Sequence, residues 1–173
     1  MRNLLLAAVL TFSVFVLNAQ DVKWHTIEEA VELNKTNPRK IMIDVYTDWC
    51  KWCKVMEKNT FMQPVVADYL NENFYAVKFN AEQREDVNIL GTTFKFVSQG
   101  GRGSHQLAAA LGATGYPYVV FLDENMNIIT SLPGYTKAPQ FDKVMNYING
   151  EHYKELAFDA WSATYTSPLE ATE

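Results

Sequence analysis

Residues 43–54 read IDVYTDWCKWCK and join an apolar run directly to a pair of cysteines. The run from Ile41 to Thr47 is mostly β-branched and aromatic, which indicates a strand buried on both faces of a sheet. A helix is expected to follow it, from Cys50 to about residue 60. Cys50 and Cys53 are the only two cysteines of the chain, and their spacing places both thiols on one face of that helix.

The cysteine spacing suits a reversible dithiol–disulfide couple. If Cys50 opens the helix, its thiol meets the positive end of the helix dipole and free backbone N–H groups, which favour the thiolate. We expect Cys50, flanked by the charge of Lys51, to be the more exposed nucleophile. Cys53 is expected to be the more buried, resolving thiol, which attacks a mixed disulfide formed at Cys50.

Two other interpretations of the cysteine pair stay open. The first is an inert structural disulfide, but closing so short a loop restrains the unfolded chain by only about 2 kcal/mol, against about 4.7 kcal/mol for a 100-residue loop. The second is a pair of thiolates that binds Cu(I), for which the sequence offers no well-placed third ligand. His25, His105 and His152 are scattered, so we predict no metal site.

The N-terminus has the pattern of an export signal. Arg2 provides a short positive region, Leu4 to Leu17 form an apolar stretch, and Asn18-Ala19 offers a small residue for cleavage. The apolar stretch is shorter than the roughly 20 residues that span a bilayer. We therefore expect residues 1–19 to be a signal peptide and the protein to be periplasmic or secreted, with an uncleaved anchor as the alternative.

The remaining length and charge limit the class of protein. Residues 20–150 are enough for one ordinary domain, and residues 151–173 form a C-terminal extension. The formal net charge of −5 argues against nucleic acid as a partner, because nucleic-acid binding needs a basic face.

Periodicity and turn residues predict an α/β fold with a mixed central sheet and helices on both faces. Thr26 and Glu29 form a capping box before the first helix. Residues 81–104 are less regular and predict a small hairpin followed by a flexible glycine-rich loop at 100–103, which lacks the lysine of a phosphate-binding loop. The expected strands are 41–47, 74–80, 118–122 and 128–132, and further helices are expected at 50–60, from Pro64, near 105–111 and at 141–148.

Several segments of the chain resemble those of a known family. The segment 43–54 is similar to the active-site segment of thioredoxin-like proteins. Asp44 lies six residues before Cys50, where that family has a buried acid, and Lys78 falls where the family places the acid's lysine partner. Gly115-Tyr116-Pro117 matches the family's cis-proline loop. Over about residues 24–150 the chain looks most like the C-terminal domain of the membrane-anchored thiol:disulfide interchange reductases.

The resemblance implies a thioredoxin-like fold with an extra insertion before the third core helix, and it implies roles for individual residues. Burial should raise the pKa of Asp44, which would then exchange a proton with Cys53, coupled to Lys78. Pro117 would be cis and would expose backbone groups of Tyr116 to a substrate strand. The alternatives are an acid that is merely satisfied by Lys78 or the backbone, and a plain turn proline.

Two tryptophans, Trp49 and Trp52, lie directly beside the cysteines in the sequence. Trp52, between the cysteines, is expected to be exposed and to contact an incoming polypeptide, whereas Trp49 could serve equally as a contact or as core packing. Lys51-Trp52 replaces the family's common Gly-Pro, and that dipeptide tunes the reduction potential. The direction of electron flow therefore stays open, as do the substrate and the oligomeric state.

These features together predict an exported thiol–disulfide oxidoreductase that reduces or isomerises protein disulfides through Cys50 and Cys53. It would need no cofactor. Its partners would be disulfide-containing exported proteins and a membrane thiol reductase that donates electrons. The alternatives are a Cu(I)-binding metallochaperone and a non-catalytic thioredoxin-like interaction module, in which the insertion 81–104 carries recognition.

Overall fold

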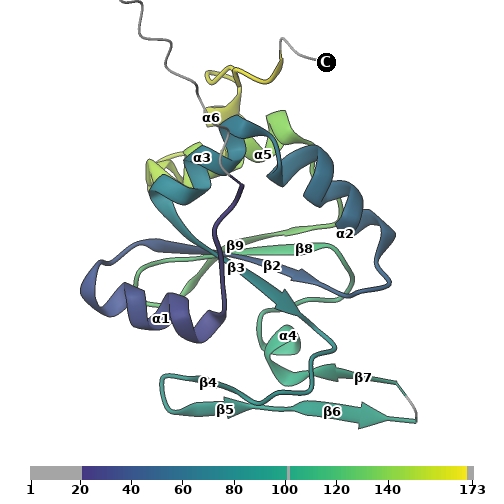
Figure 1. Ribbon diagram of the computed structural model, residues 1–173. Helices are drawn as coiled ribbons and strands as arrows, with labels where there is room; N and C mark the ends of the chain where they lie inside the picture. The colour runs from purple at the N-terminus through teal and green to yellow at the C-terminus, as the bar shows by residue number, and fades with distance from the viewer. Residues whose placement is uncertain (1–20, 101, 171–173) are drawn as a thin grey trace, which may run out of the picture.

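The computed structural model describes residues 21–100 and 102–170, so the predicted signal peptide at 1–19 lies outside the described residues. A mixed five-stranded sheet forms the centre of the molecule (Figure 1). In the order in which the strands lie side by side, the first three are parallel, the fourth is antiparallel to the third, and the fifth is antiparallel to the fourth. The strand order is β1 (Trp24–His25), β3 (Phe74–Asn80), β2 (Lys40–Tyr46), β8 (Tyr118–Leu122) and β9 (Ile128–Pro133).

Helices cover both faces of this sheet, as the sequence predicted (Figure 1). One face carries α1 (Ile27–Thr36) and α4 (Gln106–Ala110). The opposite face carries α2 (Lys51–Met56), its π-helical continuation η1 (Glu57–Phe61), α3 (Pro64–Asn73) and α5 (Ala138–Asn149). In the C-terminal extension, the short η2 (His152–Lys154) and α6 (Phe158–Ser162) pack against α5.

Strand β2 lies in the middle of the sheet and separates two hydrophobic cores. Its side chains alternate between the two faces, because successive residues of a strand point to opposite sides. The core under α2, α3 and α5 includes Met42, Phe61, Leu70, Phe121, Phe141 and Met145. The core under α1 and α4 includes Ile41, Ile43, Val45, Val77, Leu107 and Val120.

The start of α1 confirms the predicted capping box. The Thr26 hydroxyl accepts a hydrogen bond from the Glu29 backbone N–H at 3.2 Å, and the Glu29 carboxylate accepts one from the Thr26 N–H at 2.9 Å. Helix α3 begins at Pro64, where the missing N–H of proline costs no helical hydrogen bond.

The insertion differs from the prediction, because it forms two hairpins rather than a hairpin and a loop. The first pairs β4 (Val87–Ile89) with β5 (Thr92–Phe94), and the second pairs β6 (Phe96–Gln99) with β7 (Arg102–His105). Gly103, expected in a flexible loop, belongs to β7. A Cβ there would lie 2.4 Å from the Phe96 ring, so only glycine allows the two strands to approach this closely.

We expect Phe61→Ala to reduce the free energy of unfolding by about 3–5 kcal/mol, the usual cost of truncating a buried aromatic residue. Phe61 is fully buried and meets Trp24 and Phe141 edge to face, with ring centroids 5.4 and 5.3 Å away. Urea denaturation followed by circular dichroism measures the loss. The neighbouring Met62 is exposed, so Met62→Ala should change stability by less than about 0.5 kcal/mol. Equal losses in the two variants would contradict this description of the core.

Candidate active site

A disulfide joins Cys50 and Cys53 at the start of α2. Cys50 is the N-cap residue of α2 with an extended backbone (φ −69°, ψ 104°), and its Sγ accepts a hydrogen bond from the Cys53 backbone N–H at 3.0 Å. The sulfur of Cys50 therefore occupies the position in which a helix N-terminus stabilises negative charge.

The predicted difference in exposure between the two cysteines is wrong for this disulfide form. Cys50 is 4 % exposed and Cys53 is 7 % exposed, so both are buried and Cys50 is not the more accessible of the two. The reason is the capping geometry: the Cys50 side chain turns back over the first turn of α2 to accept the Cys53 N–H. The spacing of the two cysteines along the helix could not predict this orientation of the Cys50 side chain.

Asp44 lies on the face of β2 that is turned toward α2, and its carboxyl group is almost completely buried. Burial raises the pKa of Asp44 from 3.8 to about 7; the nearby Lys78 ammonium opposes this rise and the Glu57 carboxylate adds to it. Oδ1 of Asp44 has no hydrogen-bond partner among the described residues. The chain thus places, next to its disulfide, an acid that changes charge near neutral pH.

Lys78 lies beside Asp44, because the two residues are register partners on β3 and β2. Its Nζ is 3.9 Å from Oδ2 of Asp44, but it donates a hydrogen bond to the carboxylate of Glu57. The rings of Trp24 and Tyr46 also face this ammonium, with centroids 4.7 and 5.4 Å away. The predicted pairing of Lys78 with Asp44 is therefore present, but Lys78 is shared with a second acid.

A cavity of about 360 Å³ is lined by both Asp44 and Cys53. The Thr47 hydroxyl, a second buried oxygen without a hydrogen-bond partner among the described residues, also belongs to its wall. Its lining residues are Asp44, Tyr46, Thr47, Asp48, Cys53, Lys54, Glu57 and Lys78.

The surface around the disulfide is aromatic. Trp49 and Trp52 are 65 % and 60 % exposed, so Trp49 belongs to the surface and not to the core. The Trp49 ring meets Tyr116 edge to face, with centroids 6.1 Å apart. The peptide bond between Tyr116 and Pro117 is cis, as the family resemblance implied.

Three residues of the site had no prediction from the sequence. Glu57 holds Lys78, and its position four residues after Cys53 on one helix was a signal that could have revealed it. Glu82 accepts the Trp49 indole N–H through both carboxylate oxygens, each at 3.0 Å. Tyr135 lies 5.4 Å from Trp52 between ring centroids. The last two residues are distant in sequence, and only the folded chain brings them to the site.

Within residues 21–100 and 102–170, no group of three or more His, Cys, Asp or Glu side chains is arranged to hold a metal ion. Over the same ranges, each helix is too short or too polar to cross a bilayer.

Comparison with known proteins identifies the family. Residues 10–156 match the family model Thioredox_DsbH, described as "Protein of unknown function, DUF255". The chain belongs to this family. Thiol:disulfide interchange protein DsbD of Pectobacterium atrosepticum is 29 % identical over 107 residues, which cover 61 % of this chain and 16 % of DsbD. The family is therefore one of thioredoxin-like disulfide oxidoreductases, and this member carries the Cys50–Cys53 pair.

Another relative and two solved structures extend this comparison. An uncharacterized protein of Caenorhabditis elegans is 33 % identical over 136 residues, 74 % of this chain but only 17 % of that protein, so the chain spans a small part of the length of these relatives. A thioredoxin-fold protein from Helicobacter pylori superposes with a TM-score of 0.57 at 19 % identity, over 72 % of this chain and 83 % of that one. A DsbH oxidoreductase gives a TM-score of 0.54 at 17 % identity, over 91 % and 96 %. These structures confirm the thioredoxin-like fold.

We expect Asp44→Asn to stabilise the protein above neutral pH. The pKa of Asp44 is about 7 in the folded state and 3.8 for an unperturbed acid, so between these values the folded state retains a proton that the unfolded state has lost. Wild-type stability should fall relative to Asp44→Asn as pH rises from about 4 through 7, by about 4 kcal/mol in total. Urea denaturation of both proteins across this pH range measures the difference. For Asp68→Asn, at an exposed site on α3, the difference from wild type should not show this dependence.

Two further substitutions should move the pKa of Asp44 in opposite directions. Glu57→Gln removes a negative charge and should lower this pKa, whereas Lys78→Met removes a positive charge and should raise it. The pH titration of the Asp44 carboxyl carbon by NMR gives both values. Shifts in the same direction would show that the two charges do not act on Asp44 as described.

Proposed function

We propose that this chain is an exported thiol–disulfide oxidoreductase that reduces or isomerises protein disulfides through Cys50 and Cys53. The observation that carries the proposal is the position of the Cys50 sulfur, which caps α2 and accepts the Cys53 N–H, next to a cavity that leads to Asp44. A structural disulfide would need neither a helix N-terminus nor a buried acid beside it.

The reduced protein would donate two electrons in two exchanges. The Cys50 thiolate attacks one sulfur of a substrate disulfide, so that a Cys50–substrate bond forms and the other substrate sulfur leaves as a thiolate, which takes up a proton. Cys53 then loses its proton and attacks the Cys50 sulfur. The Cys50–Cys53 disulfide forms, and the second substrate sulfur leaves and is protonated. In isomerisation the substrate's own thiolate, rather than Cys53, displaces Cys50.

Asp44 would accept the proton of Cys53. A pKa of about 7 lets it act as a base at neutral pH and return the proton when the disulfide is reduced again. The cavity between the two residues has room for water, which can carry the proton. Lys78, which donates a hydrogen bond to Glu57, would place a positive charge beside Asp44 and keep the pKa of Asp44 near neutral.

The aromatic surface would bind the substrate polypeptide. Trp49 and Trp52 present large exposed rings and are sequence neighbours of the two cysteines. The loop with cis Pro117 would offer the backbone groups of Tyr116 to an extended substrate segment, in the manner of an added strand.

The proposal also includes export of the protein and a donor of electrons to its disulfide. The pattern of residues 1–19 and the likeness to DsbD support an extracytoplasmic location, with a thioredoxin-like domain over 20–150 followed by the extension 151–173. A reductase in an oxidising compartment needs a supply of electrons, and a membrane thiol reductase would provide it to the oxidised protein. Exported proteins with disulfides would be the substrates.

The equilibrium reduction potential of the Cys50–Cys53 pair tests this function. Glutathione buffers set the potential, and the fluorescence of Trp49 and Trp52 reports the redox state. A two-electron transition near about −270 mV would support a reductase, and one near about −120 mV would make the protein an oxidant. The absence of a transition would refute the redox function.

We expect the two cysteines to differ in the products that they trap. Cys53→Ser should accumulate the mixed disulfide between Cys50 and a model peptide, because the resolving thiol is missing. Cys50→Ser should accumulate none. Mass spectrometry after acid quenching detects the adduct, and equal adducts on both variants would contradict the assigned order of attack.

A further inference from the structure

Two buried side-chain oxygens of the described residues have no hydrogen-bond partner, and both line the cavity that Cys53 also lines. They are Oδ1 of Asp44 and the hydroxyl oxygen of Thr47, and both residues are almost completely buried. A buried polar group without a hydrogen bond is costly, so native proteins supply a partner from the chain or from ordered water. Two such atoms on the wall of one cavity indicate a partner that they share.

Thr47 is held where strand β2 passes into the dithiol helix. Its carbonyl oxygen accepts a hydrogen bond from the Cys50 N–H at 3.1 Å, which ties the residue after β2 to the start of α2. Its side chain is β-branched, so few rotamers are open to it. The hydroxyl therefore has a defined place on the wall of the cavity.

The charged groups around the same cavity have partners or face the solvent. The Lys78 ammonium donates a hydrogen bond to Glu57. Asp48 and Lys54 are exposed. The two unpaired oxygens are thus the buried positions from which the wall can hold a water molecule.

A hydroxyl suits this role because it can donate one hydrogen bond and accept others. When Asp44 is ionised, a water can donate to Oδ1 and accept from the Thr47 hydroxyl. When Asp44 is protonated, the same water can accept from the acid and donate to Thr47, whose O–H rotates. The cavity of about 360 Å³ has ample room for such a water.

We propose that Thr47 is a positioning residue, which holds a water between Oδ1 of Asp44 and the thiol of Cys53. The water takes the proton of Cys53 and passes one of its own protons to Asp44, so the water itself is unchanged. The Cys53 thiolate then attacks the Cys50 sulfur of the mixed disulfide, and the substrate sulfur leaves as a thiolate that solvent protonates. The proposal rests on the proposed function and names a residue that sets the rate of its second exchange.

The first experiment needs no redox reaction. The carboxyl carbon of Asp44 is titrated by NMR in the oxidised protein. Thr47→Val replaces the hydroxyl by a methyl group and should raise the pKa of Asp44, because a hydrogen bond to the charged form of the acid is lost. Thr47→Ser keeps a hydroxyl and should retain the wild-type titration.

Thr130→Val is the matched control, because it removes a threonine hydroxyl from β9, outside the cavity. It should leave the titration of Asp44 unchanged. If Thr47→Val raises the pKa of Asp44 no more than Thr130→Val does, the shared water is refuted. Should Thr47→Val fail to unfold cooperatively in urea, Thr47→Ala, which also lacks the hydroxyl, takes its place with the same expectation.

The second experiment follows the two exchanges separately. The reduced protein is mixed rapidly with a dithiobis(nitrobenzoate) disulfide, which releases one coloured thiolate when Cys50 attacks and a second when Cys53 resolves the mixed disulfide. Thr47→Val should slow the second release about tenfold, a modest part of what general acid–base catalysis contributes, and leave the first unchanged. Thr47→Ser should resolve at about the wild-type rate.

The pH dependence of the second release distinguishes proton transfer from a merely structural effect. In wild type the rate should rise as Asp44 ionises around pH 7 and then level off. In Thr47→Val the rise should move toward about pH 8.5, the ordinary range of a thiol, because Cys53 then loses its proton without the water. The other titratable groups of the cavity are the same in every variant, so the comparison reports the hydroxyl: Tyr46, Asp48, Lys54, Glu57 and Lys78.

The two possible failures are distinct. If wild type releases no thiolate, the proposed function is overturned, whatever the titration of Asp44 shows. If wild type shows both releases and Thr47→Val completes the second at the wild-type rate and with the wild-type pH profile, the role of Thr47 alone is overturned.

Discussion

The buried position of Asp44 in β2 is the constraint on which the rest of the site depends. β2 is paired on both edges, to β3 and to β8, and covered on both faces, so its register is fixed and Asp44 has to face α2. An ionised carboxylate in this environment is costly. The ammonium group of Lys78 reduces that cost. Burial nevertheless raises the pKa of Asp44 to about 7, so the carboxyl group can take up or release a proton near neutral pH.

Local patterns explain what the sequence predicted well. The capping box at Thr26 and the continuous apolar run of β2 are properties of a few neighbouring residues, and both appear as expected. The disulfide partners were fixed by there being only two cysteines, so no long-range information was needed. The cis bond before Pro117 came from the family resemblance and could not have been derived from composition or periodicity.

Features that depend on distant segments were missed. Glu82 bonds to Trp49 across 33 positions of the chain, and Tyr135, from the loop between β9 and α5, meets the ring of Trp52 only in the folded protein. The sequence predicts a loop in place of the second hairpin because Gly103 is a poor strand former by propensity, whereas the close approach of Phe96 requires glycine there. In each case a tertiary contact outweighed the local signal.

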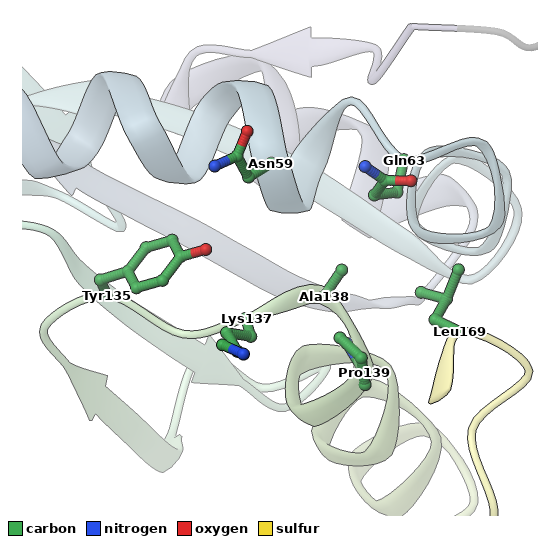
Figure 2. Close-up of a pocket in the computed structure, with 7 residues that line it drawn as sticks. All are labelled: Asn59, Gln63, Tyr135, Lys137, Ala138, Pro139 and Leu169. Atoms are coloured by element: carbon green, nitrogen blue, oxygen red, sulfur yellow. The ribbon is translucent and has the colours of Figure 1, made fainter. Parts of the chain in front are cut away.

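The π-helical segment η1 contributes side chains to two separate hollows of the protein. Residues two positions apart on a helix point to nearly opposite sides, so Glu57 borders the cavity of Asp44 while Asn59 borders a cleft between η1 and the start of α5 (Figure 2). π-helical turns occur often at functional sites, where they reorient side chains that a regular helix would stack differently. Thr60 anchors the same segment to the loop before α5. A movement of η1 would therefore change the surroundings of Asp44 and disturb the loop before α5 together.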